Sequence, residues 1–318
     1  MTTVLTPPSK VADRAFRFLT WAMAMMVLAL VVLVGWKLFE GSRPSLQKFG
    51  WSFLVHSDWD PVSGEFGALP FIFGTFVSSL LGLFIALPLS LGTAIYLTEL
   101  APQWVRQPAI SLIEMLAAIP SVIFGLWGIF VMVPWLRGNG ADDHLFPLLK
   151  RVLGFLPLFQ GPIYGVSILA AAIIIAIMIV PIITSISREV FRAVPAAQRE
   201  AAFALGATRW EVTRLAVLRT STRGIFGAAM LGLGRALGET MAVTMVIGNR
   251  PEISKSLLAP GYTLASAIAN EFAEATSDLH TSALYELGLV LLLVTIVTNI
   301  VARLLIGAAG VPKHRRQA

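Results

Sequence analysis

Two charged side chains stand alone in the apolar stretch from Gly224 to Gly248. These residues, Arg235 and Glu239, would each cost about 2.5–3.5 kcal/mol at the centre of a bilayer, so they are expected to face protein or water. Their i, i+4 spacing would place them on one face of a continuous helix, within reach of each other. A guanidinium group can bind two oxygens of an oxyanion. The pair therefore predicts an anion pathway, or alternatively a structural ion pair.

Other chemistry-bearing residues are scarce. The chain has no cysteine, and its four histidines lie outside the long apolar stretches, with no metal-binding spacing between them. The phosphate-binding pattern GxxxxGK[ST] is absent, so any ATP would have to be hydrolysed by another chain. We therefore expect no catalytic residue, no metal and no cofactor. An intramembrane enzyme is disfavoured because the apolar stretches contain no His, Cys or Asp, and Glu114 is expected to pair with Arg106 near an interface.

The composition predicts an all-α integral membrane protein. Of 318 residues, 56% are hydrophobic and only 13% are charged, against about 25% charged in an ordinary soluble domain. A helix needs about 20 mainly apolar residues to span a bilayer. Six stretches qualify: Phe18–Trp36, Phe66–Thr98, Pro108–Leu136, Ile163–Ile186, Gly224–Gly248 and Leu284–Ile306.

Two features of these spans need interpretation. Pro88, Pro120 and Pro181 fall inside spans, where neighbouring helices can satisfy the freed backbone groups. The first stretch resembles a signal peptide in its basic flank, but it is longer than the usual 7–15 apolar residues and no A-x-A site follows. We interpret it as an uncleaved anchor.

The basic residues predict the orientation. Of the 24 Lys and Arg residues, 15 lie on the side of the termini, seven of them in the loop 188–223, and eight lie on the other side. The positive-inside rule places the first side, with both termini, in the cytoplasm. This distribution explains the net charge of +6. The expected environment is membrane lipid, and no nucleic-acid partner is needed.

The loop 188–223 carries explicit helix signals. Pro195 suits a first helical turn, and the residues from Ala196 to Leu205 are nearly all helix formers. Gly206 then fits the left-handed position that ends a helix. Thr208 and Glu211 form a capping box that starts the next helix. The loop is predicted to be a short helix, a sharp glycine turn and a second helix that enters the fifth span.

One motif in this loop resembles a known family. Glu200-Ala201-Ala202, followed by Gly206, resembles the EAA---G motif of permease subunits of ATP-binding-cassette (ABC) importers. The resemblance implies a type I (MetI-like) six-helix bundle whose cytoplasmic coupling helix docks on an ATPase. Leu205 would join the two alanines in a shallow apolar patch. The family often has Leu-Pro beyond the glycine, whereas here Leu218 is followed by Arg219, so the entry into the fifth span is expected to differ.

Longer segments resemble the PstC-type permeases of the bacterial phosphate-specific transport system. They are Trp59–Thr75, Pro88–Pro102, Gly234–Val243 and Ala265–Ala275. The resemblance implies phosphate transport across the inner membrane, a heterodimer with a PstA-type permease, an ATPase dimer and a periplasmic phosphate-binding protein. It also associates Arg235 and Glu239 with transport. The implied organisation is an N-terminal anchor segment over 1–66, a transport core over 67–308 and a basic tail over 309–318.

Two alternatives stay open. A cationic site would also attract sulfate or molybdate, so charge alone does not select phosphate. An ion-coupled secondary transporter, with Glu239 or Glu114 as proton carrier, would be expected to show inverted repeats, and no convincing internal repeat is evident in the sequence.

The last outer loop predicts a short helix from Thr263 to Glu274. Leu264, Ile268 and Phe272 recur every four residues on one face, and Thr263 is a suitable N-cap. The helix is expected either to rest on the membrane surface or to serve as a platform for an external partner or a lid on the pathway.

Overall fold

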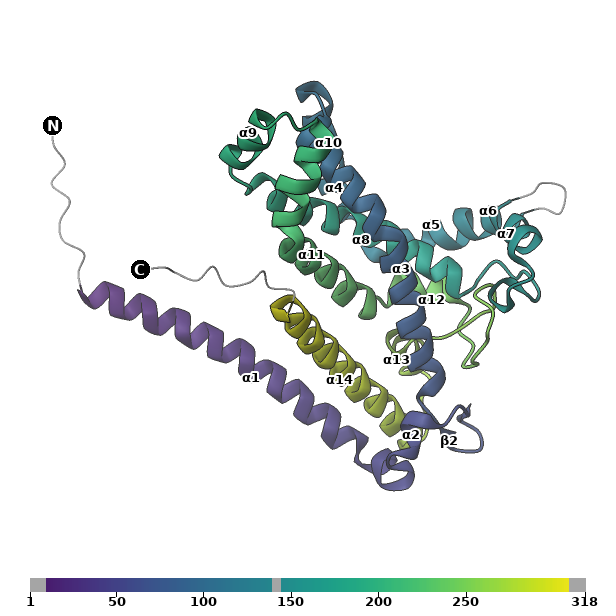
Figure 1. Ribbon diagram of the computed structural model, residues 1–318. Helices are drawn as coiled ribbons and strands as arrows, with labels where there is room; N and C mark the ends of the chain where they lie inside the picture. The colour runs from purple at the N-terminus through teal and green to yellow at the C-terminus, as the bar shows by residue number, and fades with distance from the viewer. Residues whose placement is uncertain (1–9, 139–143, 309–318) are drawn as a thin grey trace.

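The computed structural model describes residues 10–138 and 144–308 and is almost entirely helical (Figure 1). Four helices can cross a membrane unbroken, and two bent pairs complete six spans if each pair counts as one. The predicted all-α, six-span membrane protein is therefore confirmed. The elements are α1 Lys10–Phe49, α2 Ser52–Val55, β1 Trp59–Asp60, β2 Glu65–Phe66, α3 Leu69–Ile95, η1 Tyr96–Leu100, α4 Gln103–Ala118, α5 Ser121–Trp127, η2 Gly128–Met132, α6 Val133–Arg137, α7 Leu145–Leu153, η3 Pro157–Phe159, α8 Ile168–Arg192, α9 Ala196–Ala204, α10 Arg209–Val212, η4 Thr213–Leu218, α11 Arg219–Leu237, α12 Met241–Ile247, α13 Leu264–Glu271 and α14 Asp278–Ala308.

Helix α8 forms the centre of the bundle and packs against α3, α11 and α12. Lipid tails are as apolar as these side chains, so helix association depends on close packing rather than on removal of water. Small residues provide that fit. A Cβ on Gly82 of α3 would lie 2.7 Å from Ile175, and one on Gly232 of α11 would lie 2.7 Å from Ile183. These two glycines set how closely α3 and α11 approach α8.

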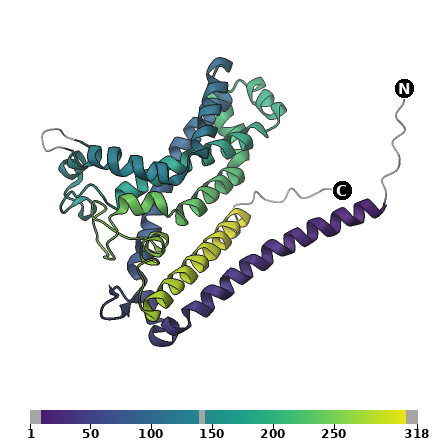
Figure 2. The same cartoon turned by 180° about the vertical axis from the view of Figure 1, so that it is seen from behind.

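Helices α1 and α14 form a second unit beside this bundle (Figures 1 and 2). Toward its own N-terminus, α1 diverges from α14 (Figures 1 and 2). The most apolar window of α1 has no buried residue. Gly41 lies against the ring of Tyr285, where a Cβ would be 2.6 Å from Cγ, and the N–H of Ser45 donates to Ser282 Oγ at 3.0 Å. One end of α1 is thus fixed on α14, while the rest presents apolar side chains outward.

The third and fifth spans are broken, although the sequence predicted continuous helices. Helix α4 ends at Ala118 and α5 starts after Pro120, with a bend of 93°. The interruption between α11 and α12 follows Leu237 and bends the chain by 66°. Proline lacks an N–H and disrupts helices, yet Pro88 and Pro181 lie within continuous helices. The sequence alone therefore did not distinguish the breaking proline from the tolerated ones.

The end of the molecule with β1, β2 and α13 is called the hairpin end, and the end with α9 is called the loop end. Helix α13 begins after Thr263, as predicted, but ends at Glu271, three residues early. Its first four residues are buried against α3, α12 and α14, and the Leu264 N–H donates to Thr75 Oγ1 at 2.9 Å. The start of this helix is therefore packed into the bundle, and its place at the membrane surface, or its role as a platform or a lid, stays a prediction.

A glycine on α3 fixes this packing, which leads to a first prediction. A Cβ on Gly74 would collide with the backbone carbonyl oxygen of Tyr262, which cannot move as a flexible side chain can. We expect Gly74→Ala to destabilise the chain by roughly 1–3 kcal/mol, as overpacking does, and to lower the melting midpoint of the detergent-purified protein. Gly92→Ala, on the same helix with no described atom within 4 Å, is the matched control. Equal midpoints for both variants would contradict this account of the packing.

Candidate functional site

Arg235 lies in the last turn of α11, beside the break in the fifth span. Its side chain is exposed and makes no hydrogen bond or ion pair to any described residue. The predicted contact with Glu239 is wrong in this structure, because the helix ends at Leu237 before it can bring positions i and i+4 together. The interpretation of the two residues as a self-neutralising buried pair loses its basis.

Glu239 is instead held at the start of α12. Only 8% of the residue is exposed, and its Oε1 accepts a hydrogen bond from the Ala242 N–H at 3.4 Å. A carboxylate is favourable at a helix N-terminus, where free N–H groups and the helix dipole carry partial positive charge. The break therefore buries this carboxylate at the N-terminus of α12, which stabilises it without any contact to Arg235.

Both residues nevertheless line one small pocket against α8. Its other walls are Ile175, Met178, Ile179 and Ala236, and it is too narrow in this conformation to hold a water molecule. The break thus places a free cation and a capped carboxylate beside the same apolar wall, without an ion pair between them.

An open face of α11 and α12 surrounds Arg235. No described atom lies within 4 Å of a Cβ placed on Gly227 or Gly234, while Leu231 and Met241 are exposed. An arginine exposed to lipid at mid-membrane is unfavourable by several kcal/mol. This face must therefore be covered by another protein or by a watery pathway, and its glycines would let a second helix approach closely.

The loop from α8 to α11 has the predicted local structure. Helix α9 covers Ala196–Ala204, and Gly206 follows with φ of +84°, in the left-handed region. Glu211 Oε2 accepts from the Thr208 N–H at 2.8 Å and completes a capping box. This backbone hydrogen bond and that from the Thr208 hydroxyl lower the pKa of the Glu211 carboxyl. The short helix, the glycine turn and the second helix are all confirmed.

Helix α9 projects at the loop end of the molecule (Figure 1) and has no buried residue in the described structure. Glu200 and Ala201 are exposed, Ala202 is half-buried, and Leu205 is 89% exposed. The sequence missed two further members of this surface, Phe203 and Trp210, which are also exposed. The loop thus offers apolar side chains and a carboxylate that no described part of the chain covers.

Residues 86–308 match the family described as binding-protein-dependent transport system inner membrane component. The chain belongs to this family. It is 47% identical over 291 residues to the phosphate transport system permease protein PstC of Mesorhizobium japonicum, covering 92% of this chain and 89% of the relative. It is 48% identical over 300 residues to PstC of Pasteurella multocida, covering 93% and 92%. The predicted PstC-type resemblance is confirmed.

Solved structures support the fold of this transport component. A chain of the MetNI methionine ABC transporter in an inward-facing conformation matches with a TM-score of 0.56 at 14% identity, over 76% of this chain and 95% of that one. A bacterial ABC transporter involved in import of the acidic polysaccharide alginate matches with a TM-score of 0.54 at 16% identity, over 93% and 99%. The predicted MetI-like bundle is therefore confirmed as the fold.

In this transport component, an arginine that the sequence did not single out anchors α9. Arg199 donates to Glu99 Oε1 at 3.0 Å and also to two backbone carbonyls, those of Phe191 at 2.7 Å and Val194 at 2.6 Å. These carbonyls belong to the end of α8 and the turn after it. One side chain thus ties the loop helix to the ends of the second and fourth spans, which would let the three segments move together.

The entry into the fifth span is a helix without interruption. The π-helical segment Thr213–Leu218 runs directly into α11 at Arg219, the position at which the resemblance led us to expect a proline. An arginine retains the backbone N–H that proline lacks. The helix is therefore continuous at this point, and a difference in the entry angle from that of the family stays a prediction.

The prediction for Glu114 is wrong. Its Oε1 lies 3.4 Å from Arg188 Nη2, rather than contacting Arg106. The Arg106 Nη2 donates instead to the carbonyls of Thr98 and Ala101, at 3.1 and 3.3 Å. Glu114 lies in α4, and its partner Arg188 in α8 is 74 positions away, so this contact was not evident in the sequence.

At the hairpin end, the sequence also missed a polar cluster. Glu271 Oε2 accepts from Trp59 Nε1 at 2.8 Å and lies 3.2 Å from His280 Nε2. These residues line a pocket of about 380 Å³ together with Tyr262 and Glu274. The hydrogen bonds join the β1–β2 hairpin to α13 and α14, so the cluster holds the outermost segments as one surface.

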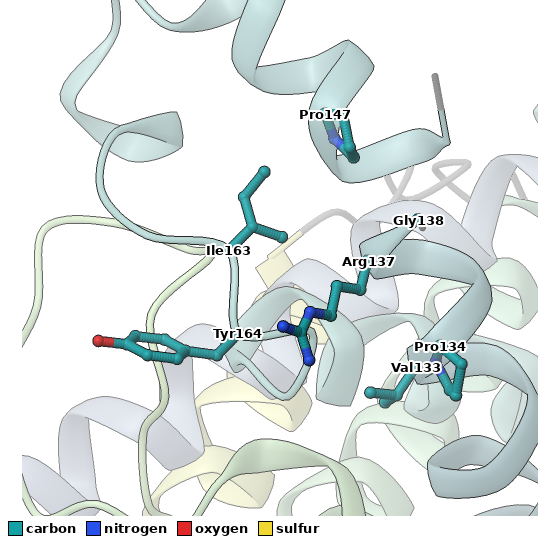
Figure 3. Close-up of a pocket in the computed structure, with 7 residues that line it drawn as sticks. All are labelled: Val133, Pro134, Arg137, Gly138, Pro147, Ile163 and Tyr164. Carbon is teal, nitrogen blue, oxygen red and sulfur yellow. The ribbon is translucent and has the colours of Figure 1, made fainter. Parts of the chain in front are cut away.

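A wider pocket, about 700 Å³, lies between α6, α7 and the segment before α8 (Figure 3). Figure 3 shows the Arg137 side chain extending between Tyr164 and Val133. Among the described residues, Arg137 is the only charged one in its wall, and none of the predicted site residues lines it. Size alone does not make it the transport site.

Proposed function

We propose that this chain is the permease subunit of an ABC importer that moves inorganic phosphate across the bacterial inner membrane. The near-full-length identity to proteins named phosphate transport system permease supports the substrate. The absence of a GxxxxGK[ST] pattern supports a subunit without catalysis of its own, driven by a separate ATPase. The loop end faces the cytoplasm, as do both termini, because the loop 188–223 carries seven arginines.

The observation that carries this proposal is the free guanidinium of Arg235 at the break of the fifth span. Within the described chain it has no partner, and its burial in lipid would be costly. In a pathway it would attract an oxyanion and could bind two oxygens through its fork. Glu239, on the same pocket, is the second pathway residue.

The carboxylate supplies selectivity in this mechanism. Phosphate near neutral pH still carries a proton that can donate to a carboxylate oxygen, whereas sulfate carries none and would be repelled. Glu239 would supply this carboxylate at the start of α12, where its Oε1 accepts from the Ala242 N–H at 3.4 Å. The site therefore combines an attractive group with a repulsive one.

Each partner has a matching surface. A PstA-type permease would cover the open face of α11 and α12 and complete the pathway around Arg235. One subunit of an ATPase dimer would receive α9 through Glu200, Ala201, Ala202, Leu205 and the turn at Gly206. A periplasmic phosphate-binding protein would dock at the hairpin end, where Trp59, Glu271 and His280 hold the surface together.

Competition of uptake tests the proposed substrate. Cells that lack this subunit, complemented with the chain, are supplied with labelled phosphate and an excess of unlabelled phosphate, sulfate or molybdate. We expect only unlabelled phosphate to suppress the uptake that depends on the chain. Equal suppression by sulfate or molybdate would assign the importer to another oxyanion. Uptake that persists after ATP depletion but follows the proton gradient would favour a secondary transporter.

A further inference from the structure

Three arginines from two spans converge on one pocket at the loop end, away from Arg235. The pocket lies between η1, α4 and α8 and has a volume of about 140 Å³. Its walls are Leu97, Thr98, Arg106, Gln107, Ile110, Arg188 and Arg192. None of these residues lines the pocket of Arg235 and Glu239.

The arginines in this pocket have unused donors. Arg188 is only 9% exposed, and its Nε has no hydrogen-bond partner among the described residues. The Nε of Arg106 is also buried without a partner there. A buried donor left unsatisfied costs about 1–3 kcal/mol, more for a charged group. Both residues line this pocket, so its wall carries hydrogen-bonding capacity that the described chain does not use.

The neighbouring carboxylates do not neutralise the pocket. Glu189 Oε1 lies 3.0 Å from Arg188 Nη2 and 3.6 Å from Arg192 Nη1. Glu114 reaches the same Nη2 of Arg188 at 3.4 Å. These contacts leave the Nε of Arg188 free, and three arginines against two carboxylates leave one formal positive charge. They also hold the Arg188 side chain in place, so the site is preorganised.

We propose that this pocket binds a phosphate group, either free inorganic phosphate or the phosphate of an anionic lipid headgroup. Several guanidinium donors on a tetrahedral oxyanion make charge-assisted hydrogen bonds, the strongest kind available here. The bound group would bridge α4 and α8. It would also lie beside Thr98, next to the Glu99 that holds Arg199 of α9. The site is separate from the pathway and does not depend on the function proposed for Arg235.

Arginine modification tests this site. The full chain in a maltoside detergent, carrying Arg235→Gln so that the pathway does not contribute, is treated with phenylglyoxal over a phosphate series at constant ionic strength. We expect phosphate to slow modification of Arg192 in a saturable way, while the exposed Arg214 reacts at an unchanged rate. The lipid arm uses nanodiscs without phosphate, where phosphatidylglycerol but not phosphatidylcholine should protect Arg192 if a headgroup occupies the pocket.

Variants of the wall decide the assignment. Gln107→Glu adds a negative charge at the exposed rim without removing an arginine contact, and it should abolish the protection. Arg106→Gln should do the same, while Arg214→Gln should leave the protection intact. Protection that is absent in both arms, or that survives Gln107→Glu, would overturn the proposal. So would protection that appears only when an ATPase subunit is added, since a protein carboxylate would then be the occupant.

Discussion

Replacing Arg235 with glutamine should reduce phosphate uptake by roughly 10- to 100-fold without loss of the assembled complex. Hydrogen bonds to charged groups contribute about 1.5–3 kcal/mol, and the guanidinium has no structural partner among the described residues. Uptake is measured in proteoliposomes, and assembly by co-purification. Arg235→Lys, which keeps the charge but loses the fork, should give an intermediate rate. If the glutamine variant transports normally, Arg235 is not in the pathway.

Glu239→Gln is expected to change the selectivity of the same site. The amide should still cap α12, so the complex should remain assembled, but the discrimination between phosphate and sulfate should weaken. A complex that works without its binding protein is needed for this measurement, because a strict external receptor would mask the change. Double replacement of Arg235 and Glu239 should transport no better than Arg235→Gln. Recovery of normal transport in the double variant would make the two residues a scaffold.

The second large effect is expected at Gly206. Its φ of +84° is strongly disfavoured for a β-branched residue. Gly206→Val should therefore change the turn after α9 and impair ATPase association, while membrane insertion remains normal. ATP-driven uptake should fall with it. ATPase association is measured by co-purification, and uptake by a transport assay on the same preparation.

Gly206→Asn is the matched control, because asparagine tolerates the left-handed region. No described atom lies within 4 Å of a Cβ at this position, so a difference between the two variants reports backbone conformation rather than collision. Normal ATPase binding and transport by Gly206→Val would show that the loop is not the docking element.

Local features were predictable from the sequence. The capping box of Thr208 and Glu211, the left-handed Gly206 and the N-cap Thr263 follow from rules that involve only a few neighbouring residues. The existence of six apolar spans follows from their length and composition. These features led to the correct fold and placed the loop helix.

Features that depend on distant segments were not predictable in this way. Arg199 finds Glu99 one hundred positions away, and Glu114 finds Arg188 rather than Arg106. The break at 238–240 contains Glu239 and removes it from the helical face that carries Arg235, although the local pattern suggested one continuous face. Each of these features depends on how the spans pack against one another, and local sequence patterns do not show that packing.

ATP-driven uptake of labelled phosphate into proteoliposomes tests the central claim most directly. The chain alone should import no phosphate when ATP is supplied on its loop-end side, because it has no nucleotide-binding pattern. Addition of a PstA-type permease, the ATPase and the phosphate-binding protein should give uptake that Arg235→Gln removes. Robust ATP-driven uptake by the chain alone, or no uptake by the complete assembly, would contradict the assignment of this chain as a phosphate permease subunit.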